Sequence, residues 1–403
     1  SLYSVPSRFS CLNSREHYKM PLIKCAKRQG HYVVLCDYLE DNIGKQYVDV
    51  FHCVSTLDKE AVLDVARKEN IDGIITNSEP AMPTCAYVGN QLGLLSNPYE
   101  SIVTLSRKDL FRNFLRENGF NCPQSYDTKD YKEAAKKISG FQFPLMVKPV
   151  DSSGSRGVSR IHSVEELEPA FDTALGFSKV KRVMIEEYIE RTHDYMIGGD
   201  MFVLDGEVAF WGLMNSMRDN AVSEFVPVGT SYPSFVSHDQ FGVIQETVQA
   251  IIDLLNIRVG PFNLELMFDK NNQLFVIEMN PRNGGNKIPE VLEAATGVDL
   301  IKANIEASLG AENISLGYDG KEKYMSTYVL HSDRSGILRG ITYNERIRKN
   351  ILKVDMDKQV GERVETFDNA EKLLGIVFLE FTSLDEMKSR LEHIKELITI
   401  DVE

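Results

Sequence analysis

A pair of facing strands with two opposed carboxylates constrains this chain more than any other feature. Residues 260–286 read GPFNLELMFDKNNQLFVIEMNPRNGGN, in which two alternating runs flank DKNNQ. If Asn271-Asn272 is a two-residue turn, counting back along both strands places Glu265 opposite Glu278. Carboxylates that face each other across a strand pair repel, so the hairpin needs a positive charge on this face. A divalent cation would supply it.

The residues around the two glutamates favour a metal site over a solvated surface. Asn263 lies opposite Asn280 in the same register, and both amides share the face of the glutamates because side chains alternate along a strand. Arg282 adds a guanidinium, and Gly284-Gly285 permits close approach of the backbone to a ligand. The alternative, an exposed face of solvated acids, needs none of these residues. An all-oxygen set with few protein ligands is typical of Mg²⁺.

A loop rich in glycine and serine precedes the hairpin in the sequence. It reads DSSGSRG (151–157) and follows an apolar strand that contains Lys148, while Lys108 opens an earlier helix. The loop is not a Walker A motif, and by itself it indicates only a turn. Two lysines, the loop and the carboxylate pair together predict a nucleoside triphosphate site, because lysines neutralise phosphates, loop N–H groups bind their oxygens and carboxylates hold Mg²⁺.

The charge of the chain argues against several classes of partner. The 403 residues include 59 acidic and 45 basic ones, for a formal net charge of −14, which disfavours binding to nucleic acid or to an anionic membrane surface. No apolar run approaches the ~18 residues of a membrane span, and no signal peptide is recognisable. Six cysteines without a CxxC pair indicate reduced thiols. We therefore expect a cytoplasmic protein with no nucleic-acid or membrane partner.

The order of apolar segments predicts more than one domain. Strands at 31–38 and 71–76 flank an amphipathic helix at 58–70, which is typical of a parallel α/β sheet. A first strand is expected within 8–14, but no GxGxxG follows it, so a dinucleotide site is not expected. After about residue 310, a strand and a helix indicate a small α+β unit.

These segments together resemble the ATP-grasp superfamily. The matching motifs run in the family's order through residues 100–310: SRKDLFR, PLMVKP, DSSGSRGV, IEEYIE, FNLELMF and VIEMNPR. The resemblance implies an α/β (α+β) protein with a Rossmann-like domain at 1–103, a two-subdomain ATP-grasp fold at 104–312 and a small α+β domain at 313–403. Members of this family are usually dimers, so a homodimer is an expected assembly.

The resemblance also implies a set of nucleotide-binding residues. Lys108 and Lys148 would contact the α- and β-phosphates of ATP, and Asp194 would take the position of the acid that binds the ribose. Lys148 and Arg282 would be catalytic, with Arg282 stabilising the transferring phosphoryl group. A mobile lid would cover the phosphates and a strand end would line the adenine. The lid comprises Ser152, Ser153, Gly154, Ser155, Gly157 and Val158, and the adenine segment Glu186, Glu187, Tyr188 and Ile189.

The metal ligands implied by the resemblance are Glu265, Glu278 and Asn280. They would hold Mg²⁺, as two ions in this family, and Mn²⁺ could substitute. The implied reaction transfers the terminal phosphoryl group of ATP to a substrate carboxylate. An amine then attacks the acyl phosphate, so ADP and phosphate are released. The partners would be a small-molecule carboxylate and an amine.

Three functions stay open. The Gly-Gly pair after NPR resembles the amino-acid ligase branch, which favours a carboxylate–amine ligase. An ATP-grasp carboxylase or a purine-biosynthesis-type ligase is the second candidate. An ATP-binding module without turnover is the third, although it would not need both glutamates. Arg218 is expected in a surface salt bridge rather than on a substrate carboxylate, and His193 and His331 are not expected to bind metal.

Overall fold

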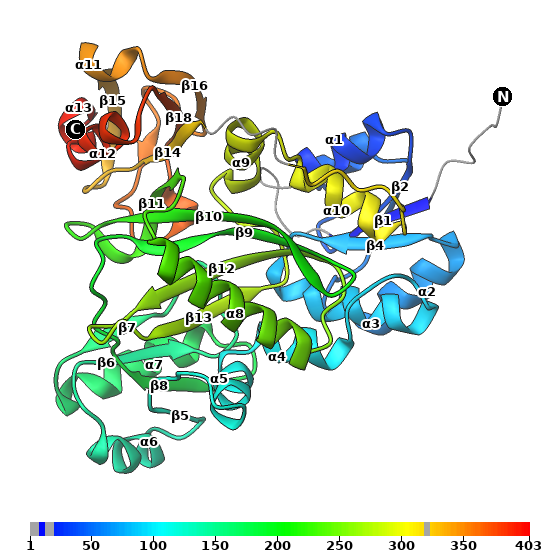
Figure 1. Ribbon diagram of the computed structural model, residues 1–403, viewed down its shortest axis with the longest axis horizontal. Helices are drawn as coiled ribbons and strands as arrows, with labels where there is room; N and C mark the ends of the chain where they lie inside the picture. Colours follow the sequence, from blue (N-terminus) through cyan, green and yellow to red (C-terminus); the bar gives the residue numbers. More distant parts are fainter. Residues whose placement is uncertain (1–7, 13–19, 318–322) are drawn as a thin grey trace.

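The computed structural model describes residues 8–12, 20–317 and 323–403 (Figure 1). Its N-terminal unit is a parallel sheet with the strand order β3-β2-β1-β4, which confirms the predicted parallel α/β sheet. Residues 13 and 14 of the expected first strand lie outside the described residues. The strands are β1 (Arg8–Leu12), β2 (Tyr32–Asp37), β3 (Val50–Cys53) and β4 (Gly73–Thr76).

Helices from distant parts of the chain cover the two faces of this sheet (Figure 1). On one face, Ile301 and Ile305 of α10 pack in one apolar cluster with Leu22 and Ile23 of α1. A helix that follows the glutamate hairpin in sequence therefore completes the N-terminal core. The helices are α1 (Met20–Arg28) and α10 (Leu300–Ser308) on this face, α2 (Lys59–Glu69) and α3 (Met82–Leu92) on the other, and the short η1 (Ile43–Tyr47) and η2 (Glu79–Ala81).

A small antiparallel sheet forms the second unit. Its strand order is β5-β8-β6-β7, and Phe171 of α7 and Ala134 of α6 are buried in its core. The strands are β5 (Ser125–Thr128), β6 (Leu145–Pro149), β7 (Ser159–Ile161) and β8 (Val183–Glu187). The helices of this unit are α6 (Tyr131–Lys137), η3 (Ile138–Gly140), η4 (Val164–Glu166) and α7 (Leu167–Phe177), and the preceding helices α4 (Tyr99–Ser106) and α5 (Lys108–Glu117) pack in a separate apolar cluster.

The largest sheet has eight strands in the order β13-β12-β9-β10-β11-β14-β18-β16. Its members up to β13 precede residue 281, whereas β14, β16 and β18 come from the C-terminal part, so one sheet crosses the expected boundary at 312. The division into three domains stays a prediction. The strands are β9 (Met196–Leu204), β10 (Glu207–Asp219), β11 (Ser223–Tyr232), β12 (Gly260–Phe268), β13 (Leu274–Asn280), β14 (Tyr324–Leu330), β16 (Ile351–Met356) and β18 (Gly375–Phe381).

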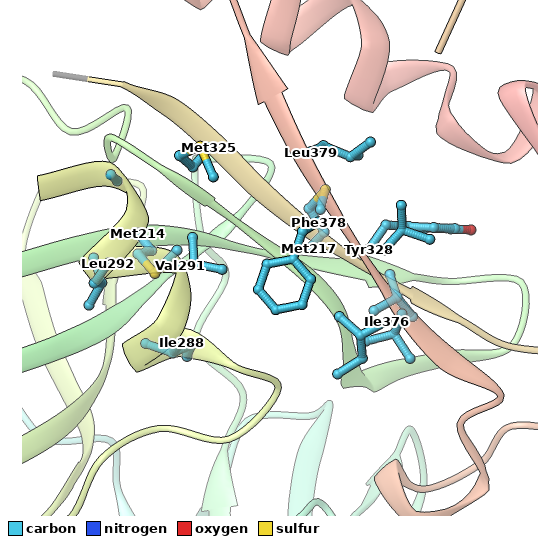
Figure 2. Packing of buried hydrophobic residues seen from close by; sticks show 14 of the residues in the cluster. Met214, Met217, Ile288, Val291, Leu292, Met325, Tyr328, Ile376, Phe378 and Leu379 are labelled. Atoms are coloured by element: carbon cyan, nitrogen blue, oxygen red, sulfur yellow. The ribbon is translucent and has the colours of Figure 1, made fainter. Parts of the chain in front are cut away.

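One apolar core runs beneath this continuous sheet. Figure 2 shows Ile288, Val291 and Leu292 of α9 beside Met214 of β10, with Tyr328 further along the same cluster. On the other face lies α8 (His238–Leu254), whose N-terminus is capped by Ser237. The remaining elements are α9 (Ile288–Thr296), β15 (Gly336–Tyr343), α11 (Glu345–Arg348), β17 (Arg363–Val364), η5 (Ala370–Lys372), α12 (Leu384–Glu392), α13 (Ile394–Leu397) and β19 (Ile398–Val402).

The glutamate hairpin has the predicted register but not the predicted turn. Glu265 pairs with Glu278, as expected, but Phe268 pairs with Leu274, so a five-residue loop replaces the two-residue turn. The side chain of Asp269 holds this loop by accepting from the N–H groups of Asn271 and Gln273. A β-bulge then leaves Ile277 as an extra residue on β13. The bulge compensates for the longer turn and restores the predicted register.

Of the helices in the described ranges, none combines the length and the apolar content that crossing a bilayer requires.

We predict that Gly199→Ala destabilises the large sheet severely. Gly199 has φ +108°, and a Cβ there would lie 2.1 Å from the carbonyl oxygen of Gly212 on the neighbouring strand. Strain of about 3 kcal/mol or more corresponds to a fall of roughly 6 °C or more in the thermal midpoint. Gly242→Ala is the control, because Gly242 lies in α8 with open space around its Cα. A midpoint for Gly199→Ala within about 2 °C of wild type would contradict this.

Candidate active site

A cavity of about 850 Å³ lies between the small sheet and the large sheet. The loop 152–155 and the end of β8 line it from the small sheet, and β9, β10, β11, β12 and β13 line it from the large sheet. The N-terminal unit contributes Glu79 and the C-terminal part contributes Ala370. All parts of the described chain thus meet at one cavity, which is where most of the predicted site residues lie.

The opposed glutamates lie on the cavity wall with a lysine beside them. The Nζ of Lys108 is 2.8 Å from Oε1 of Glu278 and donates to the carbonyl oxygen of Ser152 at 3.0 Å. Burial and the charge of Glu278 raise the pKa of Glu265. Burial also opposes ionisation of Glu278, but the charge of Lys108 prevails and lowers its pKa. Lys108 therefore balances the charge of Glu278, whereas Glu265 has no ion pair with a lysine of the described residues.

This donor set fits a divalent cation that keeps several non-protein ligands. Glu265, Glu278 and Asn280 all line the cavity, and Asn280 Nδ2 donates to Oε2 of Glu278 at 3.1 Å. Within the described residues no group of three His, Cys, Asp or Glu side chains could form a metal site. Two carboxylates and an amide leave room for water or phosphate oxygens, as Mg²⁺ prefers.

A buried charge network lies behind the pair. Glu186 forms ion pairs with Lys148 and with Arg112, whose Nε is 2.9 Å from Oε2. Burial opposes ionisation of Glu186, but Arg112 and Lys148 lower its pKa to about 2. Arg112 Nη1 also donates to the carbonyl oxygen of the bulged Ile277 at 2.9 Å. The network joins α5, the small sheet and the hairpin, and it fixes Lys148 at the cavity.

Arg112 was missed in the sequence, although it offered a signal. It lies four residues after Lys108 on α5, next to the buried Phe111, and its side chain is only 1% exposed. A buried arginine requires a carboxylate partner. That partner, Glu186, is 74 residues away in sequence, so the spacing along the chain did not reveal it.

Arg282 is held by a residue from the N-terminal unit. Its Nη2 is 2.6 Å from Oε2 of Glu79, and its Nη1 donates to the carbonyl oxygen of Asn283 at 2.9 Å. Asp200 of β9 accepts from the N–H of Gly284 and from the amide of Asn283. These contacts fix the segment after the hairpin at the edge of the cavity. Glu79 and Asp200 were not among the predicted site residues.

The loop 151–158 lies across the cavity. The hydroxyl of Ser155 donates to the carbonyl oxygen of Phe225 on β11 at 3.1 Å, and Arg156 lies 3.5 Å from Glu371 of the C-terminal part. Ser152, Ser153, Gly154, Ser155 and Val158 line the cavity. The structure therefore has the loop in a closed position, and its predicted mobility stays a prediction.

Two predicted site residues lie outside the cavity lining. Gly157 has φ +74°, and a Cβ there would be 2.8 Å from the ring of Phe177, so it shapes the loop instead of lining the cavity. Asp194 is exposed and precedes β9, whereas Arg191 and Met196 line the cavity. Asp194 therefore lies outside the cavity lining, and its predicted ribose contact stays a prediction. Glu187, Tyr188 and Ile189 all line the cavity.

The surface salt bridge expected for Arg218 was wrong. Its side chain is 6% exposed and lines the cavity, 4.0 Å from Oε1 of Glu265. His193 accepts from the N–H of Phe268, and His331 pairs with Asp219 at 3.0 Å. Within the described residues neither histidine belongs to a metal-binding cluster.

This fold and this cavity define an ATP-grasp protein. The family model "Carbamoyl-phosphate synthase L chain, ATP binding domain" matches residues 107–314, more than half of the 403-residue chain, and the chain belongs to that family. It is 27% identical over 270 residues to the carbamoyl phosphate synthase large chain of Thermoanaerobacter sp. (strain X514), covering 64% of this chain and 24% of that one. The chain thus spans about a quarter of this relative's length.

Two solved structures share the fold along almost the whole chain. The L-amino acid ligase from Bacillus licheniformis has a TM-score of 0.80 at 20% identity, covering 98% of this chain and 99% of that one. The phosphoribosylglycinamide synthetase from Anaerococcus prevotii has a TM-score of 0.75 at 20% identity, covering 99% and 100%. At these identities the likeness establishes the fold.

We predict that Asp200 makes stability fall as pH rises. Burial raises its pKa to about 6, against the hydrogen bonds from Gly284, Asn263 and Asn283. A pKa above the unfolded value favours the folded state at low pH, and that contribution is lost as pH rises through about 6. Between about pH 4.5 and pH 7.5 the loss is about 2 kcal/mol. The measurement is urea unfolding followed by the fluorescence of Trp211, the one tryptophan of the chain.

Asp200→Asn supplies the comparison for this prediction. The difference in unfolding free energy between wild type and Asp200→Asn isolates Asp200 from the other titrating groups. A difference that does not change with pH would contradict the prediction.

Proposed function

We propose that the protein is an ATP-dependent carboxylate–amine ligase that works through an acyl phosphate. The observation that carries this proposal is the opposition of Glu265 and Glu278 beside Lys108 in the cavity. Two opposed carboxylates can hold a divalent cation, and the lysine and arginine side chains that line the same cavity can bind phosphates. Together they suit a metal–triphosphate complex. The whole-length likeness to an L-amino acid ligase and to a phosphoribosylglycinamide synthetase supports ligation as the outcome.

In the proposed reaction a carboxylate oxygen of the substrate attacks the terminal phosphorus of ATP. The bond from that phosphorus to its bridging oxygen breaks, and ADP leaves. An amine then attacks the carbonyl carbon of the acyl phosphate and loses a proton. Phosphate departs with the former carboxylate oxygen, so atoms and charges balance without a protein nucleophile.

The side chains of the cavity align the reactants and neutralise charge. Lys108 and Lys148 would bind the phosphates, Arg282 would stabilise the phosphoryl group in transfer, and the closed loop would exclude water. Glu265, Glu278 and Asn280 would hold Mg²⁺, as two ions, with Mn²⁺ as a substitute. When bound, the metal would neutralise the phosphates and orient them. Glu186 to Ile189 would line the adenine.

A carboxylase is the second candidate. The 27% identity to a carbamoyl phosphate synthase large chain favours it, and its first step would phosphorylate bicarbonate in place of an organic carboxylate. The proposed site would serve both reactions, since each begins with phosphoryl transfer to a carboxylate-like oxygen.

We predict that amino acids, rather than bicarbonate, stimulate release of ADP. The assay adds a mixed pool of amino acids, then bicarbonate with ammonium, to the protein with ATP and Mg²⁺. Stimulation of about tenfold or more by the amino-acid pool alone would favour the ligase. Stimulation by bicarbonate alone would replace it with the carboxylase. No stimulation by either pool, with ATP still bound, would indicate a binding module.

We predict that Glu278→Gln abolishes turnover. Loss of one of two opposed carboxylates removes a metal ligand that aligns the phosphates, so ADP release should fall at least about a hundredfold and ATP affinity should weaken in the presence of Mg²⁺. Glu246→Gln is the matched control, because Glu246 is exposed on α8. Turnover of Glu278→Gln within a few fold of wild type would contradict the metal assignment.

A further inference from the structure

Most cationic side chains in the cavity already have a close carboxylate partner. Each partner neutralises one charge on the cavity wall, so these groups do not by themselves call for a further anion. The pairs are Lys108 with Glu278 at 2.8 Å, Arg282 with Glu79 at 2.6 Å, Arg160 with Glu224 at 3.0 Å, and Lys148 with Glu186.

Arg218 differs from these groups. Its side chain is 6% exposed, yet the nearest carboxylate, Glu265, is 4.0 Å away, which is too long for a hydrogen bond. Nη1 donates to the hydroxyl of Ser216 at 2.6 Å and to the carbonyl oxygen of Met217 at 3.1 Å. These neutral acceptors orient the guanidinium at the cavity but do not balance its charge.

A second arginine adds to the positive charge. Arg191 lines the same cavity, and across the described ranges its guanidinium has no ion pair. Burial and the charge of Arg191 together lower the pKa of Arg218 to about 10, against the attraction of Glu265. Two guanidinium groups therefore face one cavity, and the carboxylate nearest to Arg218 is Glu265 of the hairpin at 4.0 Å.

Metal binding would leave this pair without a counter-ion. In the proposed function Glu265 is a metal ligand, so its charge would be taken by the cation. The metal, Lys108, Lys148 and Arg282 would bind the phosphates of ATP. The buried charge of Arg218 then calls for an anion other than the triphosphate, because buried charges are normally paired, and the half-buried Arg191 adds to the positive charge that this anion would balance.

We propose that Arg218 and Arg191 bind a second anionic group of the carboxylate substrate, so that the substrate is dianionic. This inference rests on the proposed function. The reacting carboxylate gives up its charge when it is phosphorylated, and two guanidinium groups bound to it would weaken it as a nucleophile. A second acid group keeps its charge through both steps, so the arginines can hold it throughout the reaction.

The test compares substrates that differ by one anionic group. ADP release is measured with matched pairs, each with ATP, Mg²⁺ and one fixed mixture of amines: aspartate and asparagine, glutamate and glutamine, succinate and succinamate, phosphoglycolate and glycolate. In wild type, at least one acidic member is expected to exceed its neutral partner about tenfold or more in kcat/KM. Equal or better use of the neutral members would overturn the inference and leave the ligase function standing.

Variants assign the preference to the arginines. Arg218→Met and Arg191→Met are each expected to raise KM for the acidic substrate about tenfold or more and to remove the preference. Arg218→Lys should retain part of it, and this variant keeps the test valid if Arg218→Met does not fold. Arg346→Met is the control, because Arg346 is exposed in α11.

Nucleotide binding separates the remaining outcomes. The affinity for a non-hydrolysable ATP analogue with Mg²⁺, measured by calorimetry, is expected to stay within about threefold of wild type in both methionine variants. A loss of tenfold or more with the acid preference intact would assign the arginines to the phosphates of ATP and overturn the inference. If no carboxylate stimulates ADP release in wild type, the proposed function fails, and the inference fails with it.

Discussion

The repulsion between Glu265 and Glu278 governs the organisation of the cavity. The antiparallel pairing of β12 and β13 holds the two carboxylates opposite each other, where they are unfavourable without positive charge. Lys108 lies against one of them at 2.8 Å, and Arg218 remains 4.0 Å from the other. The large, continuous core around the hairpin stabilises the fold enough to tolerate this electrostatic repulsion. The cavity beside the two carboxylates therefore favours the binding of a cation and its phosphates.

The charges around the pair come from every part of the chain that meets the cavity. Arg112 of α5 links the small sheet to the hairpin through Glu186 and the carbonyl of Ile277. Glu79 of the N-terminal unit holds Arg282. Because the network crosses between units, displacement of one unit would disturb the site, and nucleotide binding would in turn stabilise their arrangement.

The sequence predicted the facing glutamates correctly, although it predicted the turn wrongly. The five-residue loop held by Asp269 shifts the register by one residue, and the extra residue Ile277 on β13 shifts it back. Alternation along a strand is a local property and can be read from the sequence. The carbonyl oxygen of the bulged Ile277, in contrast, accepts a hydrogen bond from Arg112, which lies on a distant helix. The ion pairs of the buried arginines were not predictable, because their partners lie on other elements. Asp194 is exposed because it lies in the segment that leads into β9, and the direction of that segment could not be read from the sequence.

The transfer of an oxygen atom from the carboxylate to phosphate tests the central claim most directly. A carboxylate substrate labelled with oxygen-18 is turned over with ATP, Mg²⁺ and an amine, and the released phosphate is examined by phosphorus NMR. An acyl phosphate intermediate predicts that each phosphate carries one labelled oxygen from the substrate. Phosphate without the label, formed at the rate of ADP release, would mean that water attacks ATP and would contradict the account.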